Sequence, residues 1–177
     1  MPSRSIVFDT SVLLNLLAAR QPESMIRSLG AECLICPAVA SETLFIRSER
    51  ILEPPELIEL KPLVEAHILK ICALEATEEY DLYVQYAMDL DDGEAMSLAI
   101  CSARGHAIAT DDRKARRIAD RSPKLEVLGT PEILHRWVAV TQPDEQQIRV
   151  VVRRIEVCAR FRPIANDPLR TWWDSFR

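Results

Sequence analysis

Residues 5–17 read SIVFDTSVLLNLL and place one acidic residue between two apolar runs. The first run, IVF, consists of strand formers, and five of the six residues in VLLNLL are apolar. Burying a lone carboxylate in such surroundings costs free energy. Asp9 must therefore either cap a helix or face something cationic. The pattern predicts a buried strand at Ser5–Phe8 and a helix at Thr10–Ala18, with Asp9 at the junction between them.

The same alternation of strand and helix continues along the chain. Further strands are predicted at 32–36, 106–109 and 125–128, and helices at 22–29, 37–49, 61–75, 78–88, 91–104, 111–120, 130–140 and 144–159. This order indicates an α/β fold, an α/β/α sandwich with a mostly parallel central sheet of four to five strands. A C-terminal helical extension follows. Residues 1–140 are thus predicted to form one domain, and residues 141–177 a helix with a Trp-containing tail that is either docked or a partner-binding arm.

Composition excludes several classes of protein. Of 177 residues, 48% are hydrophobic and only four are glycine, which is typical of a globular domain. No stretch approaches the roughly 20 apolar residues that span a bilayer, and Asp9 interrupts the N-terminal hydrophobic segment too early for a signal peptide. Most of the five cysteines lie in apolar runs, as buried thiols do in a reducing compartment. We therefore expect a cytoplasmic protein without a membrane partner.

Charge is distributed unevenly along the chain. The formal net charge is −5. Twelve acidic and two basic residues give Glu53–Glu94 a net charge of −10, whereas seven arginines and three acidic residues give Gln146–Arg177 a net charge of +4. A basic end on an acidic protein is suited to contact nucleic acid or an acidic partner, although a solvated face explains the same pattern equally well.

Four acidic positions fall at one edge of the predicted sheet. Asp9 ends the first strand, and the pair Asp111 and Asp112 ends the strand HAIAT. Glu94 lies in the first turn of the helix DDGEAMSLAI, and Glu42 is one turn into the helix that follows the second strand. Functional crevices lie at the carboxyl ends of parallel strands. We therefore expect these side chains to converge there.

Converging carboxylates repel one another unless a cation lies among them. Hard oxygen ligands without nearby His or Cys favour Mg²⁺ or Mn²⁺. Taken singly, each acid has an ordinary structural explanation: a helix cap for Asp9 or Asp111, a solvent-facing position for Glu42, and a favourable interaction with the helix dipole for Glu94. Their joint placement favours a metal site instead.

These motifs resemble those of the PIN-domain nucleases, and in particular VapC-type toxins of VapBC toxin–antitoxin systems. The similarity lies in FDTSVLLNLL, a Glu after the second strand, GEAMSLA, ATDDRKA and EVLGTPEIL, over about residues 5–140. It implies that Asp9, Glu42, Glu94 and Asp112 are catalytic, with metal held by Asp9, Glu94 and Asp112 or its neighbour Asp111. The family's third acid is commonly Asp, so Glu94 is a departure and Asp92 a nearby competitor; Ser11 and Thr110 resemble polar neighbours of the site.

The resemblance implies a metal-dependent endoribonuclease, the toxin of a type II toxin–antitoxin pair, which forms a homodimer and is inhibited by an antitoxin protein. A cation-activated water would attack an RNA phosphodiester. An acidic site must still attract a polyanion, and basic residues near the acids are expected to hold flanking phosphates of the RNA, with a solvated helix face as the alternative. These residues are Arg47, Arg50, Arg113, Lys114, Arg116 and Arg117.

Two other functions fit part of the pattern. A catalytically inactive PIN-like binding module would act through the acidic 53–94 segment or the Trp172-Trp173 tail. A haloacid-dehalogenase-like phosphatase would use Asp9 as nucleophile. Sites of the second kind usually carry another Asp two residues further on, where this chain has Ser11.

Overall fold

A computed structural model describes residues 5–50, 53–121 and 125–177. They divide into two compact units. The first unit comprises the chain up to Val12, Gly30–Glu42 and Leu60–Gly129, and the second comprises Leu13–Leu29, Thr43–Glu59 and Thr130–Arg177. Each unit therefore draws on several separate segments of the chain. The predicted boundary at residue 140 stays a prediction.

The first unit contains a five-stranded sheet in the order β5-β2-β1-β6-β7, in which every pairing is parallel. The central strand β1 pairs Ile6 with Cys33 on one side and with Ala107 on the other. It is buried throughout, as expected for an interior strand of a parallel sheet. The strands are β1 Ile6–Phe8, β2 Cys33–Ile35, β5 Lys70–Ile71, β6 Ala107–Ala109 and β7 Val127–Leu128.

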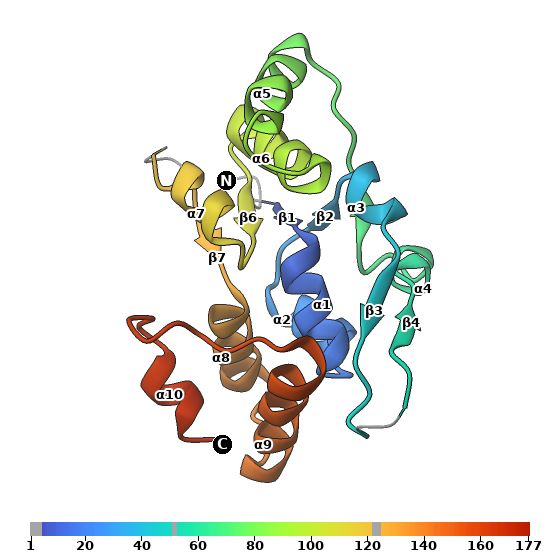
Figure 1. The fold of residues 1–177 in the computed structure, drawn as a ribbon. Helices are drawn as coiled ribbons and strands as arrows, with labels where there is room; N and C mark the ends of the chain where they lie inside the picture. The colour runs from blue at the N-terminus through green and yellow to red at the C-terminus, as the bar shows by residue number, and fades with distance from the viewer. Residues whose placement is uncertain (1–4, 51–52, 122–124) are drawn as a thin grey trace. The chain divides into compact units, whose positions relative to one another are not determined.

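Helices flank this sheet, and the predicted fold class, an α/β/α sandwich with four to five mostly parallel strands, is confirmed (Figure 1). Helix α6 packs on β1 and β6, and α5 lies along α6. The left-handed backbone of Gly105, with φ of 69°, ends α6 and turns the chain toward β6. The helices of the first unit are α3 Pro37–Ser41, α4 Lys61–Glu65, α5 Thr77–Ala87, α6 Asp92–Arg104 and α7 Arg113–Ala119.

Two predicted helices are wrong in their length. The helix predicted at 37–49 ends at Ser41, and Leu44–Ile46 forms strand β3 instead. Its alternating burial shows why: Leu44 and Ile46 are buried whereas Phe45 is exposed, which is a period of two. β3 pairs antiparallel with β4, Glu56–Ile58, and Figure 1 shows these two strands side by side.

The helix predicted at 61–75 also ends early, at Glu65. His67 has a φ of 54°, a left-handed conformation that stops the helix. The chain then forms β5, which pairs with β2 at the sheet edge. The spacing of the apolar residues after His67 is close to that of a helix, which is why a helix was predicted there. Pairing with a strand distant in sequence determines their conformation.

The second unit is mainly helical. Its helices are joined by hydrogen bonds such as that from the Trp137 indole N–H to Ser24 Oγ at 2.9 Å. Ala18, Ile46 and Cys158 form a small buried core in this unit. Helix α1 starts in the first unit and continues into the second. The helices of this unit are α1 Thr10–Ala18, α2 Pro22–Ser28, α8 Thr130–Thr141, α9 Glu145–Arg154, the π-helix η1 Ile155–Ala159 and α10 Arg170–Asp174.

The Trp-containing tail is docked within the second unit. Trp173 is fully buried, and its indole N–H donates to Glu156 Oε1 in η1 at 3.0 Å. Trp172 makes edge-on contact with His135 of α8. The described residues contain no helix that is long and apolar enough to cross a membrane.

Candidate active site

Asp9 lies at the end of the central strand, where it is only 2% exposed. Its backbone N–H donates to the Ala109 carbonyl of β6 at 2.9 Å, which fixes its position in the sheet. Its Oδ2 atom accepts hydrogen bonds from Ser11 Oγ at 2.7 Å and Thr110 Oγ1 at 2.9 Å. Burial raises the pKa of Asp9, and these hydrogen bonds offset only part of that shift.

Glu42 follows directly after α3, as its C-cap, and does not lie within a helix as predicted. Its Oε2 atom accepts a hydrogen bond from Thr10 Oγ1 at 2.8 Å. The pKa of Glu42 is raised, first by burial and then by the negative charges of Asp91 and Asp9. The negative charges of Asp91 and Asp9, from two other segments of the chain, therefore act on Glu42.

The start of α6 brings two further acids. Asp91 is the N-cap, and its Oδ1 atom accepts a hydrogen bond from the Glu94 backbone N–H at 2.9 Å. The pKa of Glu94 is raised to about 7, by burial first and then by the charges of Asp91, Asp112 and Asp9. Burial and three nearby negative charges thus both disfavour the ionised form of Glu94.

Asp91 was missed in the sequence analysis, which named Asp92 as the second acid of this turn. The Asp92 carboxylate accepts a hydrogen bond from the Tyr83 hydroxyl at 3.0 Å, whereas the charge of Asp91 acts on Asp9, Glu42 and Glu94. The spacing D-x-x-E at the start of a helix could have identified Asp91, because it is typical of an N-cap residue.

The segment after β6 places Asp111 and Asp112 differently. Asp112 is the N-cap of α7, where its Oδ1 atom accepts hydrogen bonds from two backbone N–H groups, those of Lys114 at 2.7 Å and Ala115 at 2.8 Å. Its charge contributes to the raised pKa of Glu94. Asp111 instead donates its backbone N–H to Ser11 Oγ at 3.0 Å. These contacts favour Asp112 as the acid that faces Glu94.

Two hydroxyl groups connect these segments. Ser11 Oγ donates to Asp9 and accepts from the backbone of Asp111, and Thr110 Oγ1 donates to Asp9 and accepts from the Asp112 backbone N–H at 3.1 Å. Both residues were predicted as polar neighbours of the site. Their hydrogen bonds hold the ends of β1 and β6 in a fixed relation to the Asp9 carboxylate.

We call Asp9, Glu42, Asp91, Glu94 and Asp112 the carboxylate cluster; all five belong to the first unit. Its chemistry fits a hard divalent cation, since the donors are carboxylate oxygens whose mutual repulsion a cation would relieve. Among the described residues, no three Asp, Glu, His or Cys side chains are already placed to hold a metal ion.

Comparison with known families agrees with this geometry. A family model described as a PIN domain matches residues 5–157. The chain belongs to the PIN domain family. No curated protein and no solved structure matches it. PIN domains are generally metal-dependent nucleases, so a nuclease fold acting as a hydrolase on nucleic acid is the function that membership supports.

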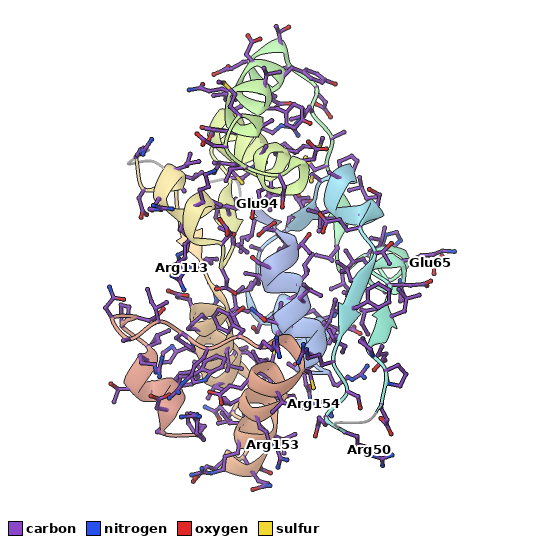
Figure 2. All side chains as sticks on the ribbon, in the orientation of Figure 1. Arg50, Glu65, Glu94, Arg113, Arg153 and Arg154 are labelled. Carbon is purple, nitrogen blue, oxygen red and sulfur yellow. The ribbon has the colours of Figure 1, made fainter. Side chains whose placement is uncertain are left out.

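The basic residues of α7 lie in the same unit of this PIN domain as the cluster. Figure 2 labels Glu94, at the start of α6, and Arg113, the first residue of α7. Arg113 and Arg117 are exposed. Lys114 pairs with the carboxylate of Asp89 at 3.3 Å, and Arg116 donates to the Thr110 carbonyl at 3.1 Å. Arg117 donates from Nε to the Arg113 carbonyl at 3.2 Å, but its exposed side chain has further donors, so Arg113 and Arg117 are the better placed of the four for contact with a phosphate.

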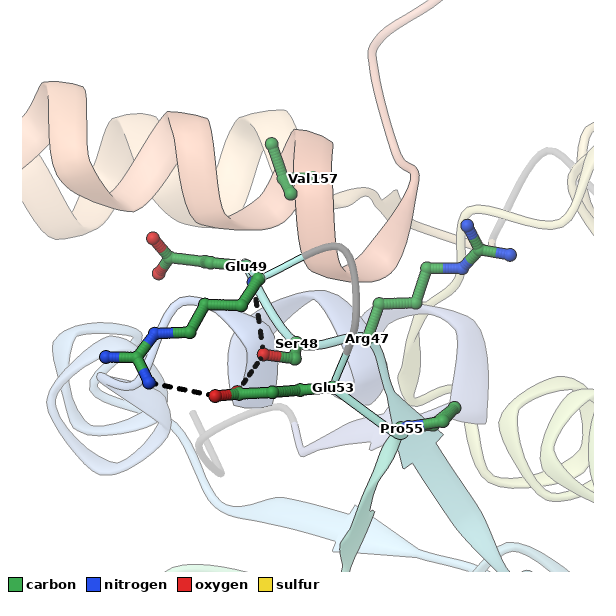
Figure 3. A pocket seen from close by; sticks show the side chains of 7 residues that line it. Arg47, Ser48, Glu49, Glu53, Pro55 and Val157 are labelled. Carbon is green, nitrogen blue, oxygen red and sulfur yellow. Dashed lines mark hydrogen bonds and ion pairs between the residues drawn. The ribbon is translucent and has the colours of Figure 1, made fainter.

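Arg47 and Arg50 do not lie at the end of the Glu42 helix, as was predicted. They follow strand β3 in the second unit, where they line a pocket of about 320 Å³ with Glu53 and Val157 (Figure 3). Arg50 forms an ion pair with Glu53 at 2.9 Å. The early end of α3 and the unpredicted strand β3 account for this change.

Gly93 offers a test of how tightly this site is packed. A Cβ atom at Gly93 would lie 2.7 Å from Glu42 Oε1 and 3.2 Å from Val39 Cγ2. Gly→Ala in a helix ordinarily stabilises a protein by about 0.5–1 kcal/mol. We expect Gly93→Ala to lose this gain and to displace Glu42, lowering nuclease activity. Thermal unfolding and a cleavage assay would measure both; a more stable variant with full activity would contradict the packing described here.

Proposed function

We propose that this PIN domain is a Mg²⁺- or Mn²⁺-dependent endoribonuclease that hydrolyses RNA phosphodiester bonds at the carboxylate cluster. The observation that carries the proposal is the mutual electrostatic effect of acids from four chain segments, most evident at Glu94. Structural carboxylates are usually neutralised by nearby bases. Here the neighbours of Glu94 that shift its pKa most are other acids.

Asp9, Glu94 and Asp112 are the proposed metal ligands, with Glu42 as a further catalytic acid and Asp91 beside them. These residues would hold a divalent cation, which would supply an activated water and stabilise negative charge on the phosphate. Ser11 and Thr110 hold Oδ2 of Asp9, and the two backbone N–H groups of α7 hold Oδ1 of Asp112. These bonds orient the carboxylates before a ligand arrives, which lowers the reorganisation that binding requires.

We further propose that the substrate is RNA and that the protein is a toxin. Both proposals rest on the resemblance of the motifs to VapC-type toxins, as do an antitoxin partner and a homodimer. A cytoplasmic location rests on the composition and the cysteines. The basic residues of α7, Arg113 and Arg117 above all, supply positive charge in the unit that holds the cluster. Phosphate contacts of this kind make binding dependent on salt.

The test is cleavage of an end-labelled RNA of mixed sequence by the purified protein. We expect cleavage with Mn²⁺ or Mg²⁺, none with EDTA, and fragments that carry 5′-phosphate and 3′-hydroxyl ends. DNA of the same sequence serves as the comparison substrate. Cleavage that continues in EDTA would contradict a metal-dependent mechanism, and absence of cleavage with either metal would favour the inactive binding module.

A further inference from the structure

The second unit carries a groove of about 340 Å³ between α9 and the last residues of the chain. Three arginines line it, Arg149 and Arg153 from α9 and Arg177 from the tail, and the only acidic residue among the lining is Glu156. The lining side chains thus carry a positive net charge in a chain whose formal net charge is −5, although Arg149 and Arg177 are each paired with a carboxylate. A groove of this sign attracts anionic ligands.

Charge-assisted hydrogen bonds hold the two walls of the groove together. Arg149 donates to Glu145 Oε1 from Nε at 3.0 Å and to the backbone oxygen of Arg177 from Nη1 at 2.9 Å. Arg177 Nε donates to Glu156 Oε2 at 3.1 Å, and Oε1 of the same carboxylate holds the buried Trp173. The tail therefore forms a fixed wall, so less conformational entropy is lost when a ligand binds.

Arg153 differs from the arginines on either side. It is exposed, one helical turn from Arg149, and no ion-pair partner is found for it within residues 5–50, 53–121 and 125–177. Figure 2 labels it on α9 beside Arg154, whose guanidinium is paired with Glu49 at 3.0 Å. Arg153 is thus a cation at the groove whose hydrogen-bond donors are available to a ligand.

An aromatic ring lies in the same groove. Phe176 lines it and makes an edge-on contact with Trp172, with ring centroids 5.3 Å apart. Positive charge combined with an aromatic side chain is the pattern by which proteins bind single-stranded nucleic acids without strong sequence preference, since phosphates contact the cations and bases stack on the ring. Duplexes offer no such unstacked bases.

We propose that this groove binds single-stranded RNA, with Arg153 in contact with a phosphate and Phe176 stacked on a base. The inference rests on the proposed function, because it assigns a second contact to the same substrate. The groove and the carboxylate cluster belong to one chain, so an RNA long enough to reach both would have a raised effective concentration at the cluster. The groove contributes to substrate binding equally before and during the reaction, and it affects KM rather than kcat.

Binding would be measured by fluorescence anisotropy with a labelled single-stranded RNA of mixed sequence, in EDTA so that no metal-dependent cleavage occurs. We expect Arg153→Gln to weaken binding several-fold and to reduce the slope of log K against log salt by about 0.7. Arg153→Lys should restore most of the affinity. Phe176→Leu keeps an apolar side chain but removes the ring, and about tenfold weaker binding is expected.

Arg136→Gln is the matched control, because Arg136 is an exposed arginine of α8 in the same unit and does not line the groove. It should bind RNA as the wild type does. Equal affinity of wild type and Arg153→Gln, or an equal loss in Arg136→Gln, would overturn the proposal.

Cleavage assays with the same variants separate the two proposals. Metal-dependent cleavage with an unchanged KM in Arg153→Gln would leave the nuclease in place and refute the groove. RNA binding that depends on Arg153, without cleavage in any metal, would support the groove and refute the nuclease.

Discussion

Replacing Asp9 by Asn is expected to lower kcat for RNA cleavage by about 10³-fold or more, since a lost metal ligand removes several kcal/mol of transition-state stabilisation and each 1.4 kcal/mol is a factor of ten. The amide has nearly the same shape as the carboxylate, and its oxygen can still accept the hydrogen bonds from Ser11 and Thr110. Single-turnover cleavage with saturating Mn²⁺ would measure the effect.

The same substitution should not unfold the protein. Burial raises the pKa of Asp9, so the folded state binds a proton more tightly than the unfolded state does. Ionised Asp9 therefore lowers stability as pH rises from the unfolded value of 3.8 through the raised folded value. Without metal, Asp9→Asn should be at least as stable as wild type near neutral pH. An inactive variant that is also unfolded would not support a catalytic role, and a fully active, folded variant would contradict it.

Replacing Glu79 by Gln is expected to cost about 3 kcal/mol of the free energy of unfolding, because it breaks a buried ion pair. Glu79 is buried in α5, where Arg104 of α6 donates to it from Nε at 2.5 Å and from Nη2 at 2.9 Å. Arg104 also donates to the Ala73 carbonyl at 2.8 Å, which ties the segment before α5 to α6. Urea unfolding at pH 7 would measure the loss.

The ion pair also predicts a pH dependence. Hydrogen bonds from Arg104 lower the pKa of Glu79 from 4.5 to about 2. Its contribution to stability is therefore complete above pH 4.5 and is lost as pH falls through about 2, and Glu79→Gln should remove this part of the profile. Glu75→Gln is the matched control: its exposed carboxylate lies 3.9 Å from Arg104, and a change within about 0.5 kcal/mol is expected. Equal losses in the two variants would contradict the pairing.

The sequence predicted the parts of the fold that local pattern determines. The strand β1 and the helix α1 were located from the IVF run and the apolar run after Asp9, because a buried parallel strand is continuously apolar. The cap expected at Asp111 lies one residue further on, because Asp112 is the N-cap of α7 whereas the Asp111 backbone N–H donates to Ser11. Strands β3, β4 and β5 were missed, because each is only two or three residues long. β5 also obtains its hydrogen bonds from β2, a partner distant in sequence.

In the candidate site, too, some residues follow from local sequence pattern and others only from the folded structure. The strand order places the ends of β1 and β6 next to each other, so Asp9, Thr110 and Asp112 could be predicted as neighbours. The D-x-x-E spacing is the signal in the sequence that favours Asp91 over Asp92 as the N-cap of α6, and the hydrogen bond from the Glu94 backbone N–H to Asp91 agrees with it. The groove of the second unit required the tail to be docked, and composition alone left that open.

The central claim is that the carboxylate cluster binds a divalent cation, and Mn²⁺ binding measured by electron paramagnetic resonance tests it without knowledge of the RNA target. Wild type is expected to show saturable binding of one or two Mn²⁺ ions, competed by Mg²⁺. Asp9→Asn and Glu94→Gln should lose it, whereas Asp81→Asn, which removes an exposed charge of α5, should retain it. No saturable binding in wild type, or equal binding in wild type and Asp9→Asn, would contradict the account.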